Sequence, residues 1–454
     1  MIEIKNISSV YFIGIGGIGM SALARYFLSK GVQVAGYDKT ETAHTKQLIA
    51  EGAKVVYTDD IDSLQKSAQL VVYTPAIPTS HVQWNYYKDN GYPLAKRSDV
   101  LQMITADTFN ICIAGTHGKT TITTMVAHIL RHSGYGCNAF LGGISANYQS
   151  NFWASERELV VLEADEFDRS FLKLSPDLAV ISSMDPDHLD IYHTKEEFAK
   201  AFVQFADQLK SGGMLYHKYG LIGLPTANAV TFDLRNTSAD IYTKSLEADR
   251  HGFRFSVCCN GEMVDDLYLP MGGTHNVENM LPAIGIALKL GISIDNIRDA
   301  IGAFKGIKRR FEIVAENENV VYIDDYAHHP QELKALLGGV KANYPDFAIT
   351  VVFQPHLYTR TRDFAQAFGE ALAMAGHVML LPLYPAREQP IEGVSSELIS
   401  QFLPTNQVTL VSKDEAIQFL TDLVTNAQQK LVLITAGAGD IDTLVERIKI
   451  LIKE

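Results

Sequence analysis

The sequence is poor in cysteine, and this scarcity limits the kinds of site that the chain can build. Its 454 residues include four cysteines, at positions 112, 137, 258 and 259. They form neither a CxxC pair nor the spacing of zinc ligands, and the adjacent pair is not a usual disulfide framework. This pattern favours reduced thiols in a cytoplasmic protein.

Long apolar runs and an excess of basic residues are also missing. No run of about 18 apolar residues occurs, and the opening MIEIKNISS lacks a basic region followed by an apolar core. The 39 Lys and Arg are outnumbered by 52 Asp and Glu, so the net charge is -13. Because a nucleic-acid partner needs a basic surface, we expect small-molecule partners, no nucleic acid and no membrane insertion.

What the chain does contain is a succession of apolar runs that alternate with helical spacing. With 47% hydrophobic residues, its length suffices for several cores. Strands and helices alternate in three modules, and we place the domain limits at 1–104, 105–306 and 307–454. Residues 212–270 are richer in β-branched and aromatic runs, from which we expect an antiparallel patch with a hairpin at Asn260-Gly261.

The strongest single signal is the stretch FNICIAGTHGKTTITTMVAHILR at residues 109–131. An apolar run ends at a glycine-containing loop, and apolar residues then recur at helical spacing, so the order is strand, loop, helix. Loop N–H groups and a helix N-terminus bind phosphates, Lys119 can reach the outer phosphates, and the Thr120 hydroxyl can bind Mg²⁺. The common P-loop has a glycine where this chain has Ile113, so the loop is shorter; a glycine turn that caps an ordinary helix is the alternative. The predicted triphosphate site comprises Gly115, Thr116, His117, Gly118, Lys119, Thr120 and Thr121.

A second glycine loop lies near the start of the chain. Gly14, Gly16 and Gly19 form GxGxxG after an apolar run, and the next expected strand ends at Asp38. This loop chemistry suits any diphosphate, so NAD, FAD and a UDP-sugar all stay open. Residues 74–77 follow a further strand and form either a wall of that pocket or a proline-containing loop without a ligand.

Ligand-type side chains follow two later apolar runs of the second module. Glu163 ends the run LVVLE, and His188 lies in DPDH after the run LAVI. If these strands neighbour the strand before Gly115, both side chains converge on the metal and γ-phosphate region; helix caps or solvated loops are the alternative. Asn279 opens a helix, where it either caps the helix or reaches a nucleotide base.

Eight motifs resemble those of the Mur ligases in both content and order. They are GIGGIGMS, AGTHGKTT, EADEFD, DPDHLDIY, GTHNVENMLPA, RRFE, DDYAHHP and FQPHLYTRTRDF, and they span essentially the whole chain. The resemblance implies an α/β protein with an N-terminal Rossmann-like domain, a central P-loop ATPase-type domain with a mixed sheet and helices, and a C-terminal Rossmann-like domain. It is greatest to the branch that joins L-alanine to UDP-N-acetylmuramate with ATP and Mg²⁺ through an acyl phosphate, in peptidoglycan precursor synthesis. We expect a monomer or homodimer.

The resemblance also implies roles for particular residues, position by position. Lys119, His188 and His328 are catalytic candidates, and either histidine could assist loss of the amine proton. The ATP-binding set adds Asn279, Arg310 and Asp325 to the loop at 115–121, and the metal set is Thr120, Glu163 and His188. Tyr326, His328 and Arg360 match the amino-acid site. The sugar-nucleotide set is Gly14, Gly16, Gly17, Gly19, Asp38, Thr74, Pro75, Ala76 and His117.

Two alternatives and one departure accompany this reading. A recycling ligase that attaches a whole tripeptide shares the phosphate loop and sugar site, although residues 354–362 look more like the alanine-adding branch. An NAD-dependent oxidoreductase would explain GxGxxG but would leave Gly118-Lys119-Thr120 without a role. Some relatives have arginine where this chain has Leu357, which would place more of the carboxylate binding on Arg360 or Arg362.

Overall fold

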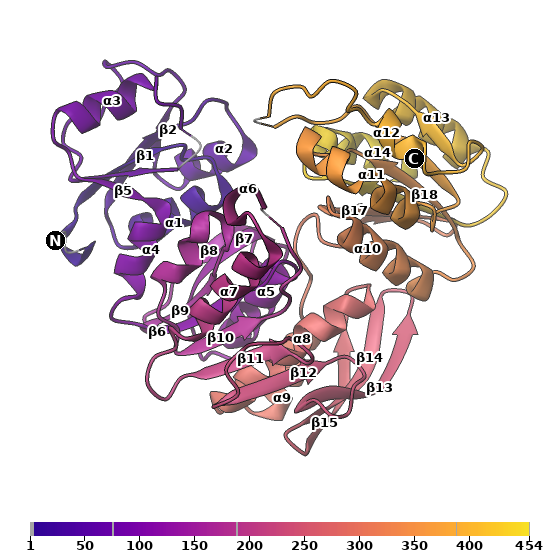
Figure 1. Cartoon of the computed structure of the whole chain (residues 1–454), viewed down its shortest axis with the longest axis horizontal. Coiled ribbons are helices and arrows are strands. Elements are labelled where there is room, and N and C mark those ends of the chain that lie inside the picture. Colours follow the sequence, from indigo (N-terminus) through magenta and orange to yellow (C-terminus); the bar gives the residue numbers. More distant parts are fainter. Residues whose placement is uncertain (1–3, 75–76, 188, 387, 454) are drawn as a thin grey trace. The chain divides into compact units, whose positions relative to one another are not determined.

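The structure is a computed structural model that describes residues 4–74, 77–187, 189–386 and 388–453 (Figure 1). Its strands form three sheets with helices between them, as expected for an α/β chain of three modules. By its contacts the chain divides into two compact units. The first comprises Met1–Thr243, Val257–Val264 and Asn279–Ile301, and the second comprises Lys244–Ser256, Asp265–Glu278 and Gly302–Glu454.

The N-terminal sheet is fully parallel and has the strand order β3-β2-β1-β4-β5. All five residues of β1 are buried, as expected for a strand covered on both faces. The order reverses between β1 and β4, and the GxGxxG loop follows β1, which is where doubly wound sheets bind ligands. The elements are η1 (Ile4–Asn6), β1 (Ser9–Ile13), α1 (Ile18–Ser29), β2 (Gln33–Tyr37), α2 (Ala43–Ala50), β3 (Lys54–Val56), β4 (Leu70–Tyr73), α3 (Val82–Asp89), β5 (Leu94–Lys96) and α4 (Arg97–Thr105).

The second sheet has ten strands in the order β15-β14-β13-β12-β11-β10-β6-β9-β7-β8. The strand before the phosphate loop, β6, lies between β10 and β9 and pairs in parallel with both. The ends of all three strands therefore meet at one edge, which fulfils the condition that the sequence analysis attached to the convergence of their end residues. The elements up to β10 are β6 (Phe109–Ala114), α5 (Lys119–His132), β7 (Asn138–Ser145), β8 (Ser150–Trp153), β9 (Leu159–Glu163), η2 (Phe167–Lys173) and β10 (Leu178–Ile181).

The expectation of an antiparallel patch at residues 212–270 is wrong for its first strands. β11 pairs in parallel with β10 and β12, and β12 with β13. Strand direction depends on the connections, which a run of β-branched residues does not encode. The hairpin is confirmed, because Asn260 (φ 50°) and Gly261 (φ 87°) join the neighbouring strands β14 and β15. The elements are α6 (Leu189–Tyr192), α7 (Lys195–Ala206), β11 (Met214–Lys218), β12 (Ala229–Asp233), β13 (Ile241–Asp249), β14 (Gly252–Cys259), β15 (Glu262–Leu269), α8 (Thr274–Lys289) and α9 (Ile294–Gly302).

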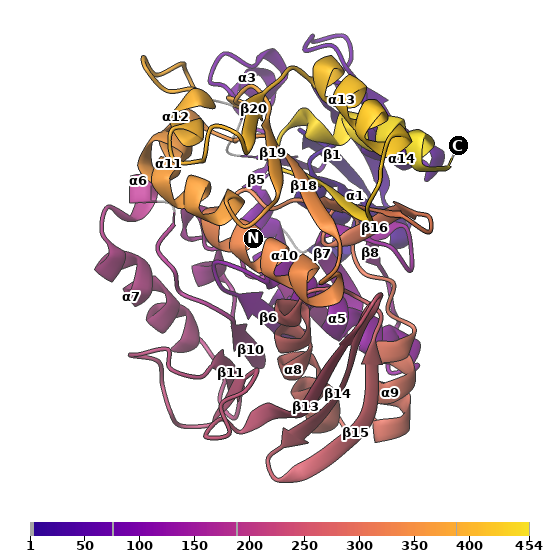
Figure 2. The same cartoon turned by 90° about the vertical axis from the view of Figure 1, so that its right-hand side faces the viewer.

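The third sheet has the order β16-β17-β21-β18-β19-β20, parallel except for β16. Its faces are covered by different helices (Figure 2). Tyr322 and Val352 pack with Leu420 of α13 and Ile448 of α14, whereas Phe353 packs on Phe368 of α11 with ring centroids 5.4 Å apart. The elements are β16 (Glu312–Glu316), β17 (Val320–Asp325), α10 (Pro330–Asn343), β18 (Ala348–Phe353), α11 (Tyr358–Leu372), β19 (His377–Leu380), α12 (Glu397–Ser400), β20 (Val408–Leu410), α13 (Lys413–Thr425), β21 (Leu431–Ala436), η3 (Asp440–Leu444) and α14 (Val445–Lys453).

Helix α1 of the N-terminal domain is docked on β8 of the central domain, within the first unit. The buried Arg25 guanidinium donates to Asn151 and, at 2.8 Å, to Glu51. Asn151 Nδ2 donates to the Ile18 carbonyl at 2.6 Å. The ring of Tyr26 packs nearby against Phe140 and Phe152. Polar and aromatic contacts together therefore fix α1 to this sheet, and we name the group Arg25, Tyr26, Asn151 and Phe152 the α1–β8 contact.

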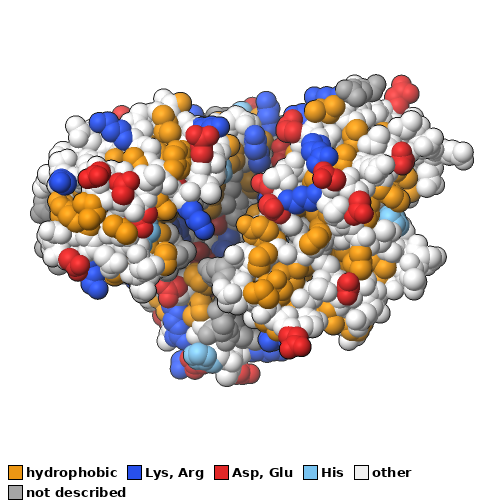
Figure 3. All heavy atoms as spheres, turned by 90° about the horizontal axis from the view of Figure 1, so that it is seen from above, with side chains coloured by type: hydrophobic (Ala, Val, Ile, Leu, Met, Phe, Trp, Pro, Cys, Tyr) orange, Lys and Arg blue, Asp and Glu red, His pale blue; other side chains and the backbone are white. Residues whose placement is uncertain are grey.

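The face of the molecule drawn in Figure 3 carries charges of both signs. On the face in Figure 3, acidic and basic side chains are interspersed and hydrophobic side chains lie among them in small groups. Within the described part of the chain, no helix combines the length and apolar character that crossing a bilayer requires.

Candidate active site

The loop between β6 and α5 has a backbone that only glycine adopts easily. Gly115 has φ +135°, and a Cβ there would lie 2.1 Å from Ser182 Oγ. Gly118 has φ +83° and precedes Lys119, the first residue of α5. The loop therefore passes close to the end of β10 and presents a helix N-terminus, as anion binding requires.

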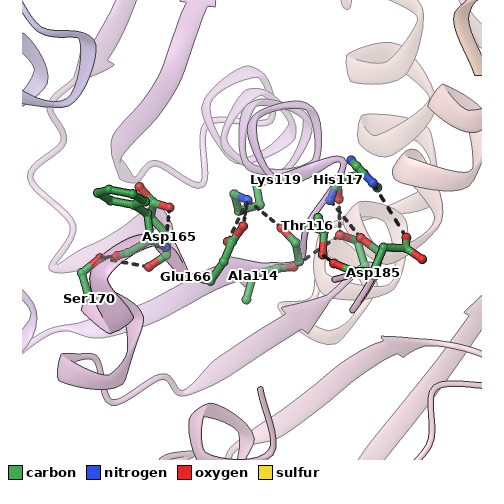
Figure 4. A network of polar contacts seen from close by, with 12 residues as sticks. Ala114, Thr116, His117, Lys119, Asp165, Glu166, Ser170 and Asp185 are labelled. Carbon is green, nitrogen blue, oxygen red and sulfur yellow. Dashed lines mark hydrogen bonds and ion pairs between the residues drawn. The ribbon is translucent and has the colours of Figure 1, made fainter. Parts of the chain in front are cut away.

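Residues after β10 hold this loop in place (Figure 4). The Thr116 hydroxyl donates to the Asp185 carbonyl at 2.7 Å, and the His117 N–H donates to Ser183 Oγ at 2.9 Å. The Ser182 hydroxyl donates to the His117 carbonyl. These bonds fix the loop from outside, so its conformation is formed before any ligand arrives. His117 Nε2 lies 3.8 Å from Asp185 Oδ2.

Lys119 points from the start of α5 toward a carboxylate (Figure 4). Its Nζ donates to both carboxylate oxygens of Glu166 at 2.8 and 2.9 Å and to the Gly115 carbonyl at 2.7 Å. Burial opposes the charge, but Glu166, Asp165 and Glu163 outweigh it, so the pKa of Lys119 is raised. The amine is thus a cation aimed at the loop.

Glu163 and Thr120 supply oxygen atoms beside Lys119. Glu163 ends β9 and accepts a bond from the Gly142 N–H at 2.7 Å and another from the Thr120 hydroxyl. Burial raises the pKa of Glu163, while Thr120 and Lys119 act against that rise. Among the residues that the structure describes, no three His, Cys, Asp or Glu side chains form a metal cluster. A carboxylate and a hydroxyl are nevertheless ligand types that Mg²⁺ accepts alongside water and phosphate. His188 lies outside the described residues.

The N-terminal glycine loop turns back on the end of β2. The N–H groups of Gly14 and Ile15 both donate to the Tyr37 carbonyl, at 2.8 and 3.0 Å. The Gly16 N–H donates to Asp38 Oδ2 at 2.7 Å, so the acid expected near a ribose is joined to the loop itself. Thr74 lies against Gly14, where a Cβ would be 3.0 Å from its methyl carbon. Gly17 is the N-cap of α1, and Pro75 and Ala76 lie outside the described residues.

Asn279, on α8 in the first unit, lies beside the phosphate loop. A Cβ at Gly118 would be 2.7 Å from Asn279 Oδ1. The two motifs GTHGKT and GTHNVEN, about 160 residues apart in sequence, therefore contribute to one site. Thr121 is buried in the first turn of α5.

In the second unit, Asp325 organises the segment after β17. Its carboxylate accepts the Phe311 N–H and the Ala327 N–H, each at 2.7 Å. Burial raises the pKa of Asp325 to about 6 against the opposing effect of Arg310. Arg310 and Arg309 lie over the ring of Tyr326, with 5.3 and 5.2 Å from guanidinium carbon to ring centroid.

His328 and Arg360 also lie in this unit and influence each other electrostatically. His328 Nδ1 donates to the Tyr326 carbonyl at 2.9 Å, which leaves Nε2 as the basic nitrogen. Burial lowers the pKa of His328; Glu332 acts against that effect and Arg360 adds to it. Glu332 Oε2 also accepts the N–H groups of His328 and His329 at 2.9 and 3.2 Å. Leu357, the N-cap of α11, has φ +70°.

Besides the N-terminal glycine loop with Asp38 and Thr74, the structure groups the predicted residues in two places. The phosphate loop, Glu163 and Asn279 lie together in the first unit, whereas Arg310, Asp325, Tyr326, His328 and Arg360 lie in the second. The sequence reading assigned no role to Glu166 or Ser182, which hold Lys119 and the loop. Glu166 lies within the motif EADEFD, so its position in that motif could have marked it as a site residue. Ser182 reaches the loop because β10 pairs with β6, and no local sequence pattern shows that pairing.

Three family models match the chain. The Mur ligase middle domain matches residues 113–287, the model described as Mur ligase family, catalytic domain matches 9–108, and that described as Mur ligase, glutamate ligase domain matches 309–439.

Full-length relatives and solved structures agree with these matches. The chain is 44% identical to UDP-N-acetylmuramate–L-alanine ligase of Cytophaga hutchinsonii, covering 100% of this chain and 98% of the relative. It is 46% identical to the protein of the same name from Porphyromonas gingivalis strain W83, over 97% and 98%. The crystal structure of UDP-N-acetylmuramate-alanine ligase MurC from Thermotoga maritima superposes with TM-score 0.81 at 28% identity, over 97% and 98%. A murein peptide ligase from Psychrobacter arcticus, 23% identical over 98% of each chain, shares the fold with TM-score 0.69.

Proposed function

Because the chain belongs to the Mur ligase family, we propose that it joins L-alanine to the carboxylate of UDP-N-acetylmuramate at the expense of ATP. The products are UDP-N-acetylmuramoyl-L-alanine, ADP and phosphate, and the reaction belongs to peptidoglycan precursor synthesis. The observation that carries the chemistry is the junction of β6 and α5, where Lys119, Thr120 and Glu163 lie together. The choice of UDP-N-acetylmuramate and L-alanine as substrates is supported by the names of the relatives that match over their full length.

The reaction has two steps. The muramyl carboxylate attacks the γ-phosphorus of ATP, the bond to the ADP oxygen breaks, and an acyl phosphate forms. The amine of L-alanine then attacks the acyl carbon, and phosphate leaves from the tetrahedral intermediate as the amine loses a proton. Because a carboxylate and a triphosphate repel each other, positioning and charge neutralisation are the main tasks of the protein.

Lys119 meets part of that need. Its protonated Nζ lies within reach of the loop carbonyl of Gly115, so a rotation about its side-chain bonds transfers its N–H donors from Glu166 to a phosphate held at the loop. Glu166 keeps the cation in place until then. The fixed N–H groups of the loop and of the first turn of α5 add dipoles that need no reorganisation.

The residues that fit a magnesium ion are Thr120 and Glu163, together with His188. When bound there, Mg²⁺ neutralises phosphate charge and helps to hold the triphosphate in line. Glu163 is held for this role by the Gly142 N–H, while its partly buried position keeps bulk water from competing.

The second unit supplies the remaining proposed contacts. Arg310 and Asp325, with Asn279 of the first unit, are the proposed nucleotide contacts. Tyr326 and His328 receive the amino acid, and Arg360 binds its carboxylate. His328 Nδ1 donates to the Tyr326 carbonyl, so Nε2 is the nitrogen that can accept a proton. His328 is therefore one candidate to take the amine proton, and His188 is the other.

The sugar nucleotide binds at Gly14, Gly16, Gly17, Gly19 and Asp38, with Thr74, Pro75 and Ala76 as a wall and His117 near the reacting carboxylate. The domain limits are 1–104, 105–306 and 307–454, and the enzyme works in the cytoplasm as a monomer or homodimer.

Phosphate release from Mg-ATP tests the proposal directly. The purified protein is mixed with Mg-ATP and UDP-N-acetylmuramate, with and without L-alanine, and the released phosphate is measured. The mass of the nucleotide product is determined by mass spectrometry. We expect release that requires both partners and a product heavier by one alanyl residue. Turnover with the tripeptide and not with L-alanine would assign the recycling reaction instead. Inactivity with both acceptors, together with oxidation of NAD(P)H, would favour the oxidoreductase alternative.

A further inference from the structure

A small cavity of the first unit is lined in part by an arginine to which the reaction described so far gives no role. Its lining includes Arg97, Glu163 and Asp165, so it lies between the start of α4 and the end of β9. Glu163 belongs to the proposed magnesium site, and Arg97 comes from the domain that carries GxGxxG. The cavity therefore lies where the N-terminal domain meets the strand end that carries Glu163.

Arg97 lies directly against the N-terminal glycine loop. A Cβ at Gly19 would be 2.9 Å from Arg97 Nη1 and 3.0 Å from its Cδ. Gly19 is the last glycine of GxGxxG, so any larger residue there would displace the arginine. The Arg97 side chain is 28% exposed, so part of it faces solvent.

The partner of this guanidinium is held loosely. Arg97 Nη2 lies 3.6 Å from Asp165 Oδ2, which is longer than a good charged hydrogen bond. Asp165 meanwhile accepts the Phe167 N–H with its other oxygen at 3.1 Å. A planar guanidinium beside a single distant carboxylate oxygen retains donors for a second anionic group.

The backbone that carries Arg97 is fixed independently of this pair. Asp99 accepts the Lys96 N–H at 2.9 Å and forms an ion pair with Lys173, whose Nζ also donates to Ser98 at 3.1 Å. The start of α4 is thus tied to η2 without any contribution from Arg97. Its side chain can exchange partners while the helix stays in place.

We propose that Arg97 binds anionic oxygens of the sugar nucleotide, exchanging Asp165 for the ligand as it arrives. This inference rests on the proposed function, because it takes UDP-N-acetylmuramate as the ligand. The ligand runs from the glycine loop at Gly19 to the strand end at Glu163, and Arg97 lies between these points. Both its diphosphate and its sugar-borne carboxylate match a guanidinium bidentately.

Equilibrium binding to the full-length protein tests this role. The dissociation constants of UDP-N-acetylmuramate, UDP-N-acetylglucosamine and Mg-ATP are measured for the wild type, Arg97→Ala and Arg97→Lys. We expect Arg97→Ala to weaken the binding of UDP-N-acetylmuramate by about tenfold or more. Arg97→Lys should weaken this binding less, and the affinity for Mg-ATP should stay unchanged in both variants. An equal loss for UDP-N-acetylglucosamine, which lacks the carboxylate, assigns Arg97 to the diphosphate; a loss confined to UDP-N-acetylmuramate assigns it to the carboxylate.

Two matched variants separate ligand binding from a structural role. Lys96→Met removes the neighbouring cation, whose Nζ lies equally far from Asp168 at 3.6 Å, and should leave binding unchanged. Asp165→Asn removes the charge that Arg97 pairs with. If Arg97 acted only by stabilising the structure through Asp165, this variant would show the same loss of UDP-N-acetylmuramate affinity as Arg97→Ala.

Three results would overturn the inference. They are unchanged UDP-N-acetylmuramate affinity in Arg97→Ala, an equal loss in Asp165→Asn, and a parallel loss of Mg-ATP affinity. A wild-type protein that binds no UDP-N-acetylmuramate would instead overturn the proposed function, and the inference with it.

Discussion

At the scale of single residues, the site combines buried charges that are each held by a defined partner. Lys119 is the clearest case, because three hydrogen bonds fix a cation at the mouth of the phosphate loop. Burial disfavours this charge, but the nearby carboxylates, Glu166 above all, keep it in place, and in the proposed reaction the same charge contacts the phosphates. One side chain therefore combines a structural role with the proposed catalytic role.

Lys119→Ala should lower turnover by about 10²–10³-fold, because it removes a cation aimed at the charge that develops during phosphoryl transfer. Binding of UDP-N-acetylmuramate should stay nearly unchanged, since the glycine loop after β1 is separate. Phosphate release and equilibrium binding measure the two effects. Lys200→Ala, which removes an exposed lysine of the same unit, is the control. Normal turnover in Lys119→Ala would contradict the assignment.

Asp324 provides a pH-dependent stability test in the second unit. It is 1% exposed and accepts bonds from Arg309 at 3.0 Å and Thr435 at 2.6 Å. Burial nevertheless raises its pKa from 3.8 to about 6. Between these values the folded state binds more protons than the unfolded state, so the contribution of Asp324 to stability declines as the pH rises from about 4 to above 6.

Asp324→Asn should therefore lose this pH dependence. Relative to the wild type, its free energy of unfolding should improve by up to about 3 kcal/mol between pH 4 and pH 7. Melting temperatures of the two proteins across this range measure the change. Asp295→Asn, at an exposed position, should follow the wild type. A constant difference between Asp324→Asn and the wild type would show that the carboxylate ionises normally.

At the scale of elements, the phosphate loop depends on the strand beside it as much as on its own sequence. Ser182 and Ser183, which follow β10, bond to the loop, and β10 reaches it because it pairs with β6. The loop lacks the glycine of longer P-loops, and these bonds from outside replace part of the internal constraint. Its geometry is thus a property of two elements together.

Gly115→Ala should damage the loop severely. The new methyl group would lie 2.1 Å from Ser182 Oγ at a backbone φ of +135°, so loop or strand must move. A displacement of this size should lower turnover by about 10²-fold and weaken ATP binding. Gly134→Ala, after the same helix, also has positive φ but meets nothing within 4 Å; it should cost about 1 kcal/mol of stability and leave activity intact. Equal effects of both variants on turnover would contradict this account.

The elements show where sequence reasoning succeeds and where it stops. The strands before Gly115, Glu163 and Asp185 were predictable, because buried parallel strands are continuous apolar runs that end in polar residues. That these strands lie next to one another could only be assumed, because strand pairing joins residues far apart in sequence. For the same reason the direction of β11 and β12 was missed, and the contacts of Arg97 and Ser182 were invisible. The resemblance to a family supplied what local patterns could not, namely a proposed ligand for each glycine loop.

At the scale of the whole molecule, the first unit holds both glycine loops, the proposed ligand sites, in one compact body. The α1–β8 contact joins the helix after the N-terminal glycine loop to the central sheet. Because the glycine loop leads directly into α1, fixing this helix also fixes the loop with respect to the central sheet. Under the proposed function, the sugar nucleotide would therefore meet a preformed surface within this unit.

Arg25→Met should destabilise the first unit by about 2 kcal/mol, because it breaks the pair with Glu51 and leaves Asn151 short of a donor in a buried place. The melting temperature of Arg25→Met should fall below that of the wild type. Lys46→Met, which removes an exposed ion pair with Glu41, is the control and should keep the melting temperature of the wild type. Differential scanning calorimetry measures both. An unchanged transition in Arg25→Met would mean that the α1–β8 contact adds no net stability.

The α1–β8 contact also determines which segments can be exchanged between relatives. A chimaera cut at residue 104 would bring a foreign α1 onto a β8 that still carries Asn151 and Phe152, whose partners Arg25 and Tyr26 would be gone unless the donor has them. The transferable block is therefore larger than the sugar-binding sheet and includes the hairpin of β7 and β8. Recombination that moves this block as a whole preserves the α1–β8 contact. Substrate specificity can then be exchanged without further substitutions at that contact.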